Sequence, residues 1–498
     1  MSYLGLDIGT SGCKALIFDA AGRTLASAYR EYVLQRPQPG WAELDPTLVA
    51  ARCFEVIREA AVATPHDPVR ALAISCQGEA FTPVDSNGRP LGNAMVSSDT
   101  RAAALIQDWG DRFGAERLYE ITGHTAHPLF SLFKLLWLRE HAPDTWRQAR
   151  RFLCFEDFIH LRLGLEPAIG WSLAGRTLLF DVRRHAWSDE ILAEAGLRSD
   201  QLARPLPSGA PVGILPDTIA GEIGLPLGVQ VVAGGHDQVC AALGAGATAP
   251  GEAMYATGTV ECIAANLEKP VFTSALREAN LCTYDHAAPG RSATLAYSLT
   301  GGNLLQWFRD QWAQNEIHEA SRNGESAYAR ILRDLAPEPT RLLVLPYFTP
   351  SGTPYFDADT AGAILGLRLT TTRGEVLRAL LEGVAFEMRL NLELLAESGV
   401  PVHSLRAVGG GARNDAWLQL KADVVNRPIA RLEVSEAGCL GAALLACAAH
   451  TGEPVAALAA RWVRPTAVTT PDPARAAFYT ERFAAYRTLY PALRTLKL

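Results

Sequence analysis

Two segments of the chain share one pattern: an apolar strand, a turn built on a Gly-Thr pair, and a second apolar strand. The first segment runs from Tyr3 to Asp19 around the turn Gly9-Thr10-Ser11-Gly12, and the second runs from Ala253 to Asn266 around Gly258-Thr259. Apolar runs separated by short glycine turns predict β-hairpins. The repeat therefore predicts an internally duplicated α/β architecture.

The rest of the pattern alternates strands and helices. Further strands are predicted at residues 69–75 and 229–233 and directly before Gly409, and Asn87-Gly88 predicts another hairpin. Helices are predicted from Pro46 after the N-cap Asp45, over most of residues 100–162, from Arg373 to a stop at Gly399, and from Gly438. The small, flexible stretch 246–252 predicts a boundary between an N-terminal domain of residues 1–247 and a C-terminal domain of residues 248–498.

Charge and composition exclude several classes of protein. The 46 basic and 53 acidic residues give a net charge of −7, which disfavours nucleic-acid binding. The longest apolar stretch, around residues 438–449, is too short to span a membrane, and the N-terminus lacks the basic region of a signal peptide. The nine scattered cysteines contain no Cys-x-x-Cys pair, which indicates reduced thiols and a cytoplasmic location.

The motifs of several large enzyme classes are missing from the sequence. There is no GxxxxGK[ST], no GxGxxG before a helix, no GxSxG and no HExxH. Their absence excludes P-loop, dinucleotide-binding, serine hydrolase and zinc protease chemistry. His124 and His127 have no third candidate ligand near them, so we expect turn or surface residues there rather than a metal site.

The first hairpin turn has the chemistry of a phosphate-binding loop. Its two glycines let the backbone approach an anion, Thr10 and Ser11 can donate hydrogen bonds, and Lys14 adds positive charge. Asp7 precedes the turn, and a carboxylate close to phosphates is suited to holding Mg²⁺. An ordinary hairpin turn is the alternative interpretation.

Three further glycine loops could complete a nucleotide site. They are Gly258-Thr259, Gly301-Gly302-Asn303 with Gln306 just beyond, and Gly409-Gly410-Gly411 followed by Asn414. The triple glycine enters a predicted helix, so it offers a flat surface for an aromatic base next to helix N-terminal amides. Taken alone, each loop is also compatible with a plain turn.

Asp237 is the strongest single candidate for catalysis. It follows Gly234-Gly235-His236, a predicted glycine turn at the carboxyl end of a strand, where α/β folds bind ligands. A carboxylate there could accept the proton of a substrate hydroxyl that attacks phosphorus. The alternative role is the N-cap of the following helix, and the two roles are compatible.

In their order along the chain, these motifs resemble the FGGY carbohydrate kinases over nearly the whole sequence. The stretches that carry the resemblance are DIGTSGCK, SLFKLLWLREH, GGHDQ, ATGT, GAILGLRLTTTRGEVLRALLEG and VGGGARNDAWLQLKADV. The resemblance implies an α/β fold of two RNase H-like (actin-like ATPase) domains that flank a deep catalytic cleft. It also implies transfer of the γ-phosphoryl group of ATP to a hydroxyl of a small sugar, with ATP and Mg²⁺ as cofactors.

Carried over by position, the resemblance assigns a role to each candidate residue. Asp237 would be the catalytic base, and Asp7 would serve Mg²⁺. The residues implied to contact ATP are Thr10, Ser11, Lys14, Gly258, Thr259, Gly302, Gln306, Gly410, Gly411 and Asn414. The residues implied to bind the sugar are Gln77, Gly78, Glu79, Asp99, Arg101, Asp237 and Gln238.

The sugar site departs from that of well-known members of this family. Gly78-Glu79 stands where glycerol kinases have Arg-Glu and xylulokinases have Met-His, Leu129 replaces a tyrosine, and Ser97 replaces a tryptophan. Glycerol is therefore disfavoured, while His236-Asp237 resembles the deoxyketohexose kinases.

A ketose such as xylulose is the expected substrate, and a deoxyketohexose (fuculose- or rhamnulose-like) or a polyol is the alternative. From another class, a non-catalytic sensor of ATP or sugar with the same fold stays open. A homodimer, and a role of His236 or Cys76 in substrate choice, also stay open.

Overall fold

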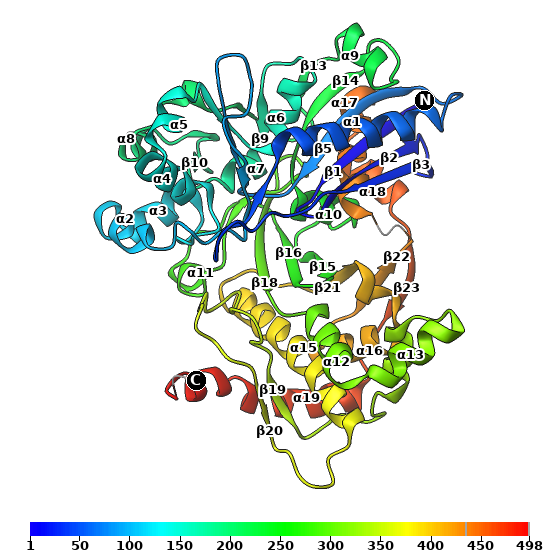
Figure 1. The fold of residues 1–498 in the computed structure, drawn as a ribbon. Coiled ribbons are helices and arrows are strands. Elements are labelled where there is room, and N and C mark those ends of the chain that lie inside the picture. The colour runs from blue at the N-terminus through cyan, green and yellow to red at the C-terminus, as the bar shows by residue number, and fades with distance from the viewer. Residues whose placement is uncertain (434–435, 497–498) are drawn as a thin grey trace.

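The computed structural model describes residues 1–433 and 436–496, which form a two-domain α/β structure around two main sheets (Figure 1). The first sheet has the strand order β13 (Pro211–Ile214), β14 (Gln230–His236), β5 (Val69–Cys76), β1 (Ser2–Ile8), β2 (Gly12–Asp19) and β3 (Thr24–Glu31). The second has the order β17 (Tyr284–Asp285), β18 (Ser292–Ser298), β16 (Glu261–Leu267), β15 (Glu252–Thr257), β21 (Ser404–Val408), β22 (Ile429–Leu432) and β23 (Pro465–Thr469).

Short ribbons and helices complete the described chain. The ribbons pair β4 (Glu43–Leu44) with β7 (Ala94–Met95), β6 (Thr82–Val84) with β8 (Arg151–Leu153), β9 (Ala168–Gly170) with β12 (Arg204–Leu206), β10 (Phe180–Asp181) with β11 (Ala186–Trp187), and β19 (Leu343–Leu345) with β20 (Ala363–Leu365). The helices before β15 are α1 (Pro46–Val62), α2 (Leu105–Phe113), α3 (Ala115–Thr122), α4 (Ser131–His141), α5 (Pro143–Gln148), α6 (Phe155–Arg162), α7 (Trp171–Gly175), α8 (Asp189–Ala195), α9 (Asp217–Glu222) and α10 (Asp237–Gly244). Those after it are α11 (Ser274–Glu278), α12 (Gly302–Trp312), α13 (Gln314–Asn323), α14 (Ala327–Ile331), α15 (Arg373–Glu397), α16 (Asp415–Val425), α17 (Ala437–Thr451), α18 (Val455–Trp462), α19 (Pro473–Tyr486) and α20 (Leu489–Arg494).

Both predicted Gly-Thr hairpins are confirmed. β1 pairs antiparallel with β2, placing Asp7 opposite Lys14, and β15 pairs antiparallel with β16, placing Thr257 opposite Glu261. Each first strand pairs in parallel on its other side, β1 with β5 and β15 with β21. The two main sheets therefore share the same central arrangement, as the sequence repeat predicts.

The turn predicted at Asn87-Gly88 is present, but the prediction that the strands on either side of it pair with each other is wrong. The flanks of the turn are joined by a bridge between Val84 and Pro90 and by backbone hydrogen bonds from Asp85 to Arg89 and from Leu91 to Pro83, but they do not form a pair of strands. Instead, β6 pairs with β8 and β7 pairs with β4. Asp85 closes the turn by accepting hydrogen bonds from two backbone amides. Pro90 lacks the amide hydrogen that a longer ladder would use.

The predicted glycine turn before Asp237 is also wrong, because Gly234 and Gly235 belong to strand β14. A Cβ on Gly234 would lie 1.8 Å from the carbonyl oxygen of Ile74, and one on Gly235 would lie 2.2 Å from Ser172 Oγ. The glycines are required by the close approach of neighbouring segments rather than by a turn. β14 therefore continues to His236, and α10 begins at Asp237.

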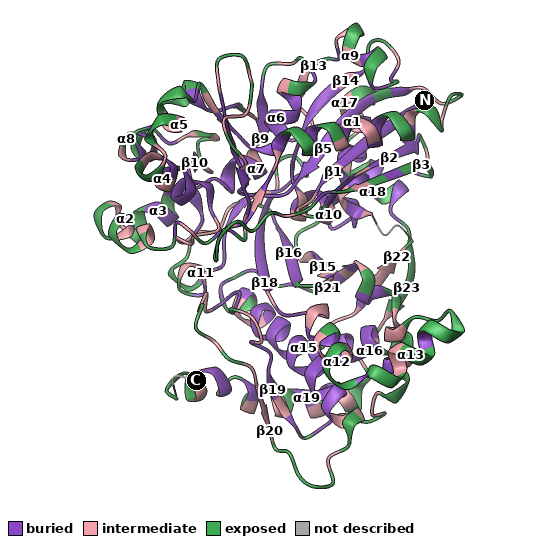
Figure 2. Cartoon of the chain, viewed as in Figure 1, coloured by how far each residue is buried: buried purple, intermediate pink, exposed green. Residues whose placement is uncertain are grey.

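Helix α17 belongs to the second half of the sequence but packs on the first sheet, against β1, β5 and α10 (Figure 1). The contact with α10 is built on glycine: a Cβ on Gly441 would lie 1.9 Å from the carbonyl oxygen of Cys240, and one on Gly244 would lie 1.9 Å from that of Ala437. One apolar core consequently joins the first sheet to α17 and to the buried side of α18, and Figure 2 shows the strands of the first sheet as largely buried. No helix in residues 1–433 or 436–496 is both long and apolar enough to cross a membrane.

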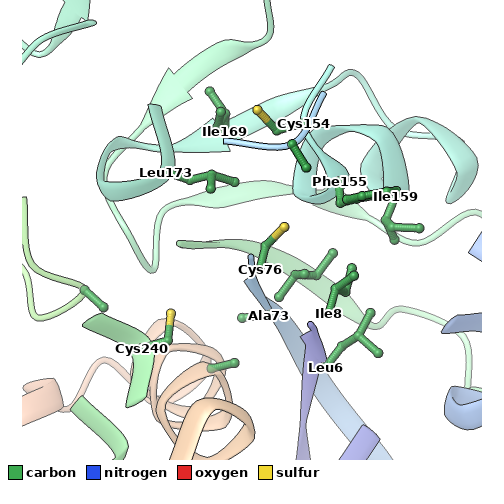
Figure 3. Close-up of a cluster of buried hydrophobic side chains, with 14 of the residues drawn as sticks. Leu6, Ile8, Ala73, Cys76, Cys154, Phe155, Ile159, Ile169, Leu173 and Cys240 are labelled. Carbon is green, nitrogen blue, oxygen red and sulfur yellow. The ribbon is translucent and has the colours of Figure 1, made fainter. Parts of the chain in front are cut away.

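An apolar cluster surrounds the ends of β1 and β5 (Figure 3). Its members are fully or nearly fully buried and come from β1, β5, β9, α6, α7 and α10. They are Leu6, Ile8, Ala73, Cys76, Cys154, Phe155, Ile159, Ile169, Leu173 and Cys240. This packing fixes the ends of β1 and β5, from which the glycine turn 9–12 and the segment 77–79 leave.

We expect Gly441→Ala to lower the free energy of unfolding by about 3 kcal/mol, the upper end of the range for overpacked cores. The added methyl group would overlap the backbone of α10. The matched control is Gly110→Ala in α2, where nothing lies within 4 Å of the new Cβ and alanine has the better helix propensity. Urea unfolding of both variants tests this, and equal stabilities would contradict the glycine contact.

Candidate active site

The carboxyl ends of β1, β5 and β14 meet at one edge of the first sheet, because the three strands are adjacent and parallel. Ile8 lies opposite Cys76, and Cys76 lies opposite His236. The segments that leave these ends carry the turn 9–12, the predicted sugar segment 77–79, and Asp237. The structure thus brings the first predicted phosphate turn, the predicted sugar segment 77–79 and the predicted base to one edge of the sheet, where open α/β sheets bind ligands.

Asp237 is the first residue of α10, and its N-cap is His236. The interpretation of Asp237 as the N-cap is therefore wrong. Asp237 Oδ1 lies 3.2 Å from His236 Nε2. Burial, together with the negative charges of Asp7 and Glu79, raises the pKa of Asp237 to about 7. The next residue, Gln238, has a buried Oε1 that accepts no hydrogen bond within the described part of the chain.

Glu79 is held by a buried ion pair that sequence reasoning missed. Arg176 Nε donates to Glu79 Oε1 at 2.5 Å, and the two side chains are only 6% and 4% exposed. The backbone of Glu79 has a φ of 64°, and Ser131 Oγ donates to its carbonyl at 2.8 Å. A left-handed conformation costs a non-glycine residue about 1 to 3 kcal/mol, so surrounding contacts must impose it.

The space beside Gly78 is filled by the imidazole of His236. A Cβ on Gly78 would lie 2.9 Å from His236 Nε2. The other ring nitrogen, Nδ1, lies 3.0 Å from the hydroxyl of Tyr284. The absence of a side chain at Gly78 therefore leaves the space that the His236 ring occupies. Tyr284 is a second contact of this ring, and no sequence motif indicated it.

His124 is not the turn or surface residue that its spacing suggested. It is buried, and its ring packs edge-on against Tyr284 with centroids 5.5 Å apart. Burial, with Arg176 nearby, lowers the pKa of His124 to about 3, so the ring is neutral at physiological pH. Its Nε2 is buried and has no hydrogen-bond partner among the described residues.

The predicted sugar residues Asp99 and Arg101 form a closed pair. Arg101 Nη2 donates to Asp99 Oδ2 at 2.6 Å and to Glu43 Oε1 at 2.6 Å, and the guanidinium stacks 3.6 Å from the Trp41 ring centroid. The Arg101 side chain is 3% exposed. A sugar contact by either residue would have to share these bonds, and their sugar role stays a prediction.

Asp7 suits a magnesium ion that shares its shell with phosphate and water. Its Oδ1 accepts from Ser75 Oγ at 2.6 Å, while burial raises its pKa against the opposing effects of Ser75 and Lys14. Mg²⁺ usually takes one or two protein carboxylates and completes its octahedron with waters and substrate phosphates. Within residues 1–433 and 436–496, no group of three or more His, Cys, Asp or Glu residues could hold a metal ion.

The predicted phosphate turn 9–12 and the strand after it contact the segment 77–79 and the start of α17. Lys14 Nζ forms a 2.6 Å ion pair with Glu436, the N-cap of α17. Thr10 Oγ1 donates to Gln77 Oε1 at 3.2 Å, and Ser11 is exposed. Lys14 would therefore share or exchange its partner if it contacted a phosphate.

The predicted nucleotide loops of the second domain converge on the end of β15. The amide of Gly302 donates to the carbonyl of Gly258 at 2.9 Å, and that of Asn303 donates to Thr259 at 3.1 Å. Gln306 follows one turn later on α12. These bonds bring the second hairpin turn to the N-terminus of α12.

The triple-glycine loop reaches the same strand end. A Cβ on Gly411 would lie 3.0 Å from the Thr257 carbonyl oxygen, whereas one on Gly410 would meet nothing within 4 Å. Asn414 caps α16, since its Oδ1 accepts from the amide of Trp417 at 2.9 Å. Gly410 thus offers an open backbone surface, and the nucleotide role of Asn414 stays a prediction alongside its capping role.

The two main sheets, each with glycine turns at the carboxyl ends of its parallel strands, have the fold of sugar kinases of the actin-like ATPase class, as the match to solved xylulose kinase structures shows. The model of the FGGY family of carbohydrate kinases, N-terminal domain, matches residues 2–244, and that of the C-terminal domain matches residues 253–450. The chain belongs to the FGGY family of carbohydrate kinases. It is a phosphotransferase with a sugar hydroxyl as acceptor, in a family that uses ATP.

The similar proteins include xylulose kinases and glycerol kinases. The chain is 28% identical to a xylulose kinase of Bacillus subtilis (strain 168), covering 100% of this chain and 98% of that protein. It is 32% identical to a glycerol kinase of Methylibium petroleiphilum, covering 93% and 94%. Among solved structures, a xyloylose kinase from Brucella ovis matches with a TM-score of 0.90 and 30% identity over 100% of both chains.

We expect Arg176→Met to destabilise the protein by about 3 to 5 kcal/mol, because it leaves the buried carboxylate of Glu79 without its partner. The double variant Glu79→Met with Arg176→Met should recover most of this stability but no kinase activity. Thermal unfolding and turnover of the single and double variants separate the two effects. Full activity in the double variant would show that the pair is only structural.

We expect kcat/KM to fall as the pH drops through about 7. The folded protein raises the pKa of Asp237 to that value, and a base acts only as its carboxylate, so activity is present above this pH and lost below it. A pH–rate profile of kcat/KM at constant ionic strength gives the midpoint. An acid limb near 4, the ordinary range of a carboxyl group, would contradict Asp237 as the essential base.

Proposed function

We propose that this protein transfers the γ-phosphoryl group of ATP to a ketose of the xylulose class, with Asp237 as the base. The observation that carries the proposal is the Asp237 carboxylate at the edge of the first sheet. It lies beside Gln238, whose buried Oε1 can accept a hydrogen bond from a ligand. It is also close enough to Glu79 for that negative charge to raise its pKa. The names of several relatives, xylulose kinases at 25 to 29% identity, support the sugar class.

The residues present account for each part of the reaction. The turns around Thr10 and Thr259 would hold the phosphates of ATP through backbone amides and hydroxyl groups. A magnesium ion bound by Asp7 would neutralise charge on the phosphates. Glu79 and Gln238 would orient the sugar hydroxyls, and Asp237 would take the proton late, because a loose transition state needs little activation of the nucleophile.

The proposal includes the division into domains 1–247 and 248–498, with the sugar and ATP held in a cleft between them. Closure of such a cleft would exclude water and limit ATP hydrolysis. Because α17 packs on the first sheet, we propose that it moves with the first domain although its residues lie within 248–498. A cytoplasmic location and a homodimer remain further proposals.

A deoxyketohexose is the second candidate substrate. The observation that favours it is His236, whose ring occupies the space beside Gly78 and so reshapes the site next to the base. A non-catalytic sensor is the alternative from another class, and it would bind ATP or sugar without turnover.

The test is an ADP-release assay with Mg²⁺ and ATP across xylulose, fuculose, rhamnulose, glycerol, tetritols and gluconate, each against a blank without sugar. We expect the largest kcat/KM for xylulose. A preference for a deoxyketohexose would select the second candidate, and a flat panel with tight ATP binding would select the sensor.

Asp237→Asn should lower kcat by about 10² to 10⁴-fold, the usual contribution of a general base, while ATP binding is unchanged. Calorimetric titration with ATP and single-turnover kinetics measure the two properties separately. Retained turnover in this variant would remove Asp237 as the base.

A further inference from the structure

We infer that Tyr284 and His236 form a positioning chain that orients the carboxylate of Asp237. The inference rests on the proposed role of Asp237 as the base. Tyr284 would donate its hydroxyl proton to His236 Nδ1, and His236 would donate from Nε2 to Asp237 Oδ1. Neither Tyr284 nor His236 need touch the substrate, so both act through Asp237.

The distances support each link of the chain. The hydroxyl of Tyr284 lies 3.0 Å from His236 Nδ1, and His236 Nε2 lies 3.2 Å from Asp237 Oδ1. Tyr284 is fully buried and His236 is 4% exposed, so water cannot readily substitute for either group. Two buried side chains thus form a line that ends on the carboxylate.

The direction of the hydrogen bonds follows from the protonation states. Burial raises the pKa of Tyr284, so its hydroxyl keeps the proton and can donate. Burial, with Arg176 and His124 nearby, lowers the pKa of His236, so its imidazole is neutral and carries a single N–H. If Tyr284 donates to Nδ1, that N–H is on Nε2, which faces Asp237.

The imidazole is held from several sides. Gly78 leaves room for the ring, since a Cβ there would lie 2.9 Å from Nε2 and 3.0 Å from Cδ2. The backbone amide of His236 donates to Ser172 Oγ at 3.1 Å. Holding one carboxylate oxygen of Asp237 in this way fixes the direction of the other.

Tyr284 is itself anchored although it comes from the second sheet. The amide of the preceding residue, Thr283, donates to the carbonyl of Gly123 at 2.8 Å, and Tyr119 Oη donates to the carbonyl of Leu281 at 2.9 Å. Gly123 and Tyr119 belong to the first domain. The segment of β17 is therefore tied to the same body as the base, which suits a positioning role.

The experiment compares Tyr284→Phe, His236→Leu, His236→Gln and the double variant Tyr284→Phe with His236→Leu, using the sugar that gives turnover. We expect Tyr284→Phe and His236→Leu to lower kcat by about 10- to 100-fold, a range typical of small misplacements of reacting groups, with KM for sugar and ATP changed less than about twofold. His236→Gln should recover much of the kcat lost in His236→Leu, because its amide can donate at the position of Nε2.

In the double variant, kcat should fall no further than in His236→Leu alone, because the two residues act in series. A purely structural effect would instead add, or would change KM and stability as well. Tyr486→Phe is the matched control, since it removes a buried phenol hydroxyl that donates to Glu387 at 2.6 Å outside the site, and its kcat should stay unchanged.

The outcomes separate the inference from the function on which it rests. If Asp237→Asn is inactive while Tyr284→Phe and His236→Leu keep the original kcat, the positioning chain is wrong and the base assignment stands. If Asp237→Asn itself keeps turnover, the proposed base is wrong whatever the other variants do. An additive double variant would also overturn the chain.

Discussion

The site depends on the parallel packing of β14 on β5 and of β5 on β1, which brings three strand ends to one edge. The approach is close enough that Gly234 admits no Cβ. Glu156 reinforces it, since its carboxylate accepts from the amides of Gly234 at 2.7 Å and of Gly170 at 2.9 Å. The buried carboxylate of Glu156, on α6, thus holds β14 through a backbone amide of that strand. β14 is the strand that ends next to the proposed base, Asp237.

Charge balance is the second constraint on this edge. Burial makes Asp237 costly to ionise, and the negative charges of Asp7 and Glu79 add to that cost. Arg176 compensates the charge of Glu79, while Asp237 keeps a raised pKa. In the proposed function the magnesium ion would compensate Asp7, and Asp237 would be left to act as the base.

Local signals in the sequence were sufficient for the two Gly-Thr hairpins, the long helices and the acids at strand ends, because these depend on short-range periodicity and turn residues. They failed where glycine is needed because a neighbouring segment packs closely against the backbone. Gly234 and Gly235 lie in a strand rather than in a turn. Arg176 lies 97 residues from Glu79, and Tyr284 lies 48 residues from His236. Neither residue stands in a motif, so only the folded chain reveals the ion pair and the buried surroundings of the base.

The most direct measurement is a crystal structure with xylulose and a non-hydrolysable ATP analogue bound together with Mg²⁺. We expect a sugar hydroxyl within hydrogen-bonding distance of Asp237 and in line with the γ-phosphate, with Gln238 and Glu79 contacting other hydroxyls. A bound sugar whose phosphate-facing hydroxyl contacts no atom of Asp237 would contradict this expectation.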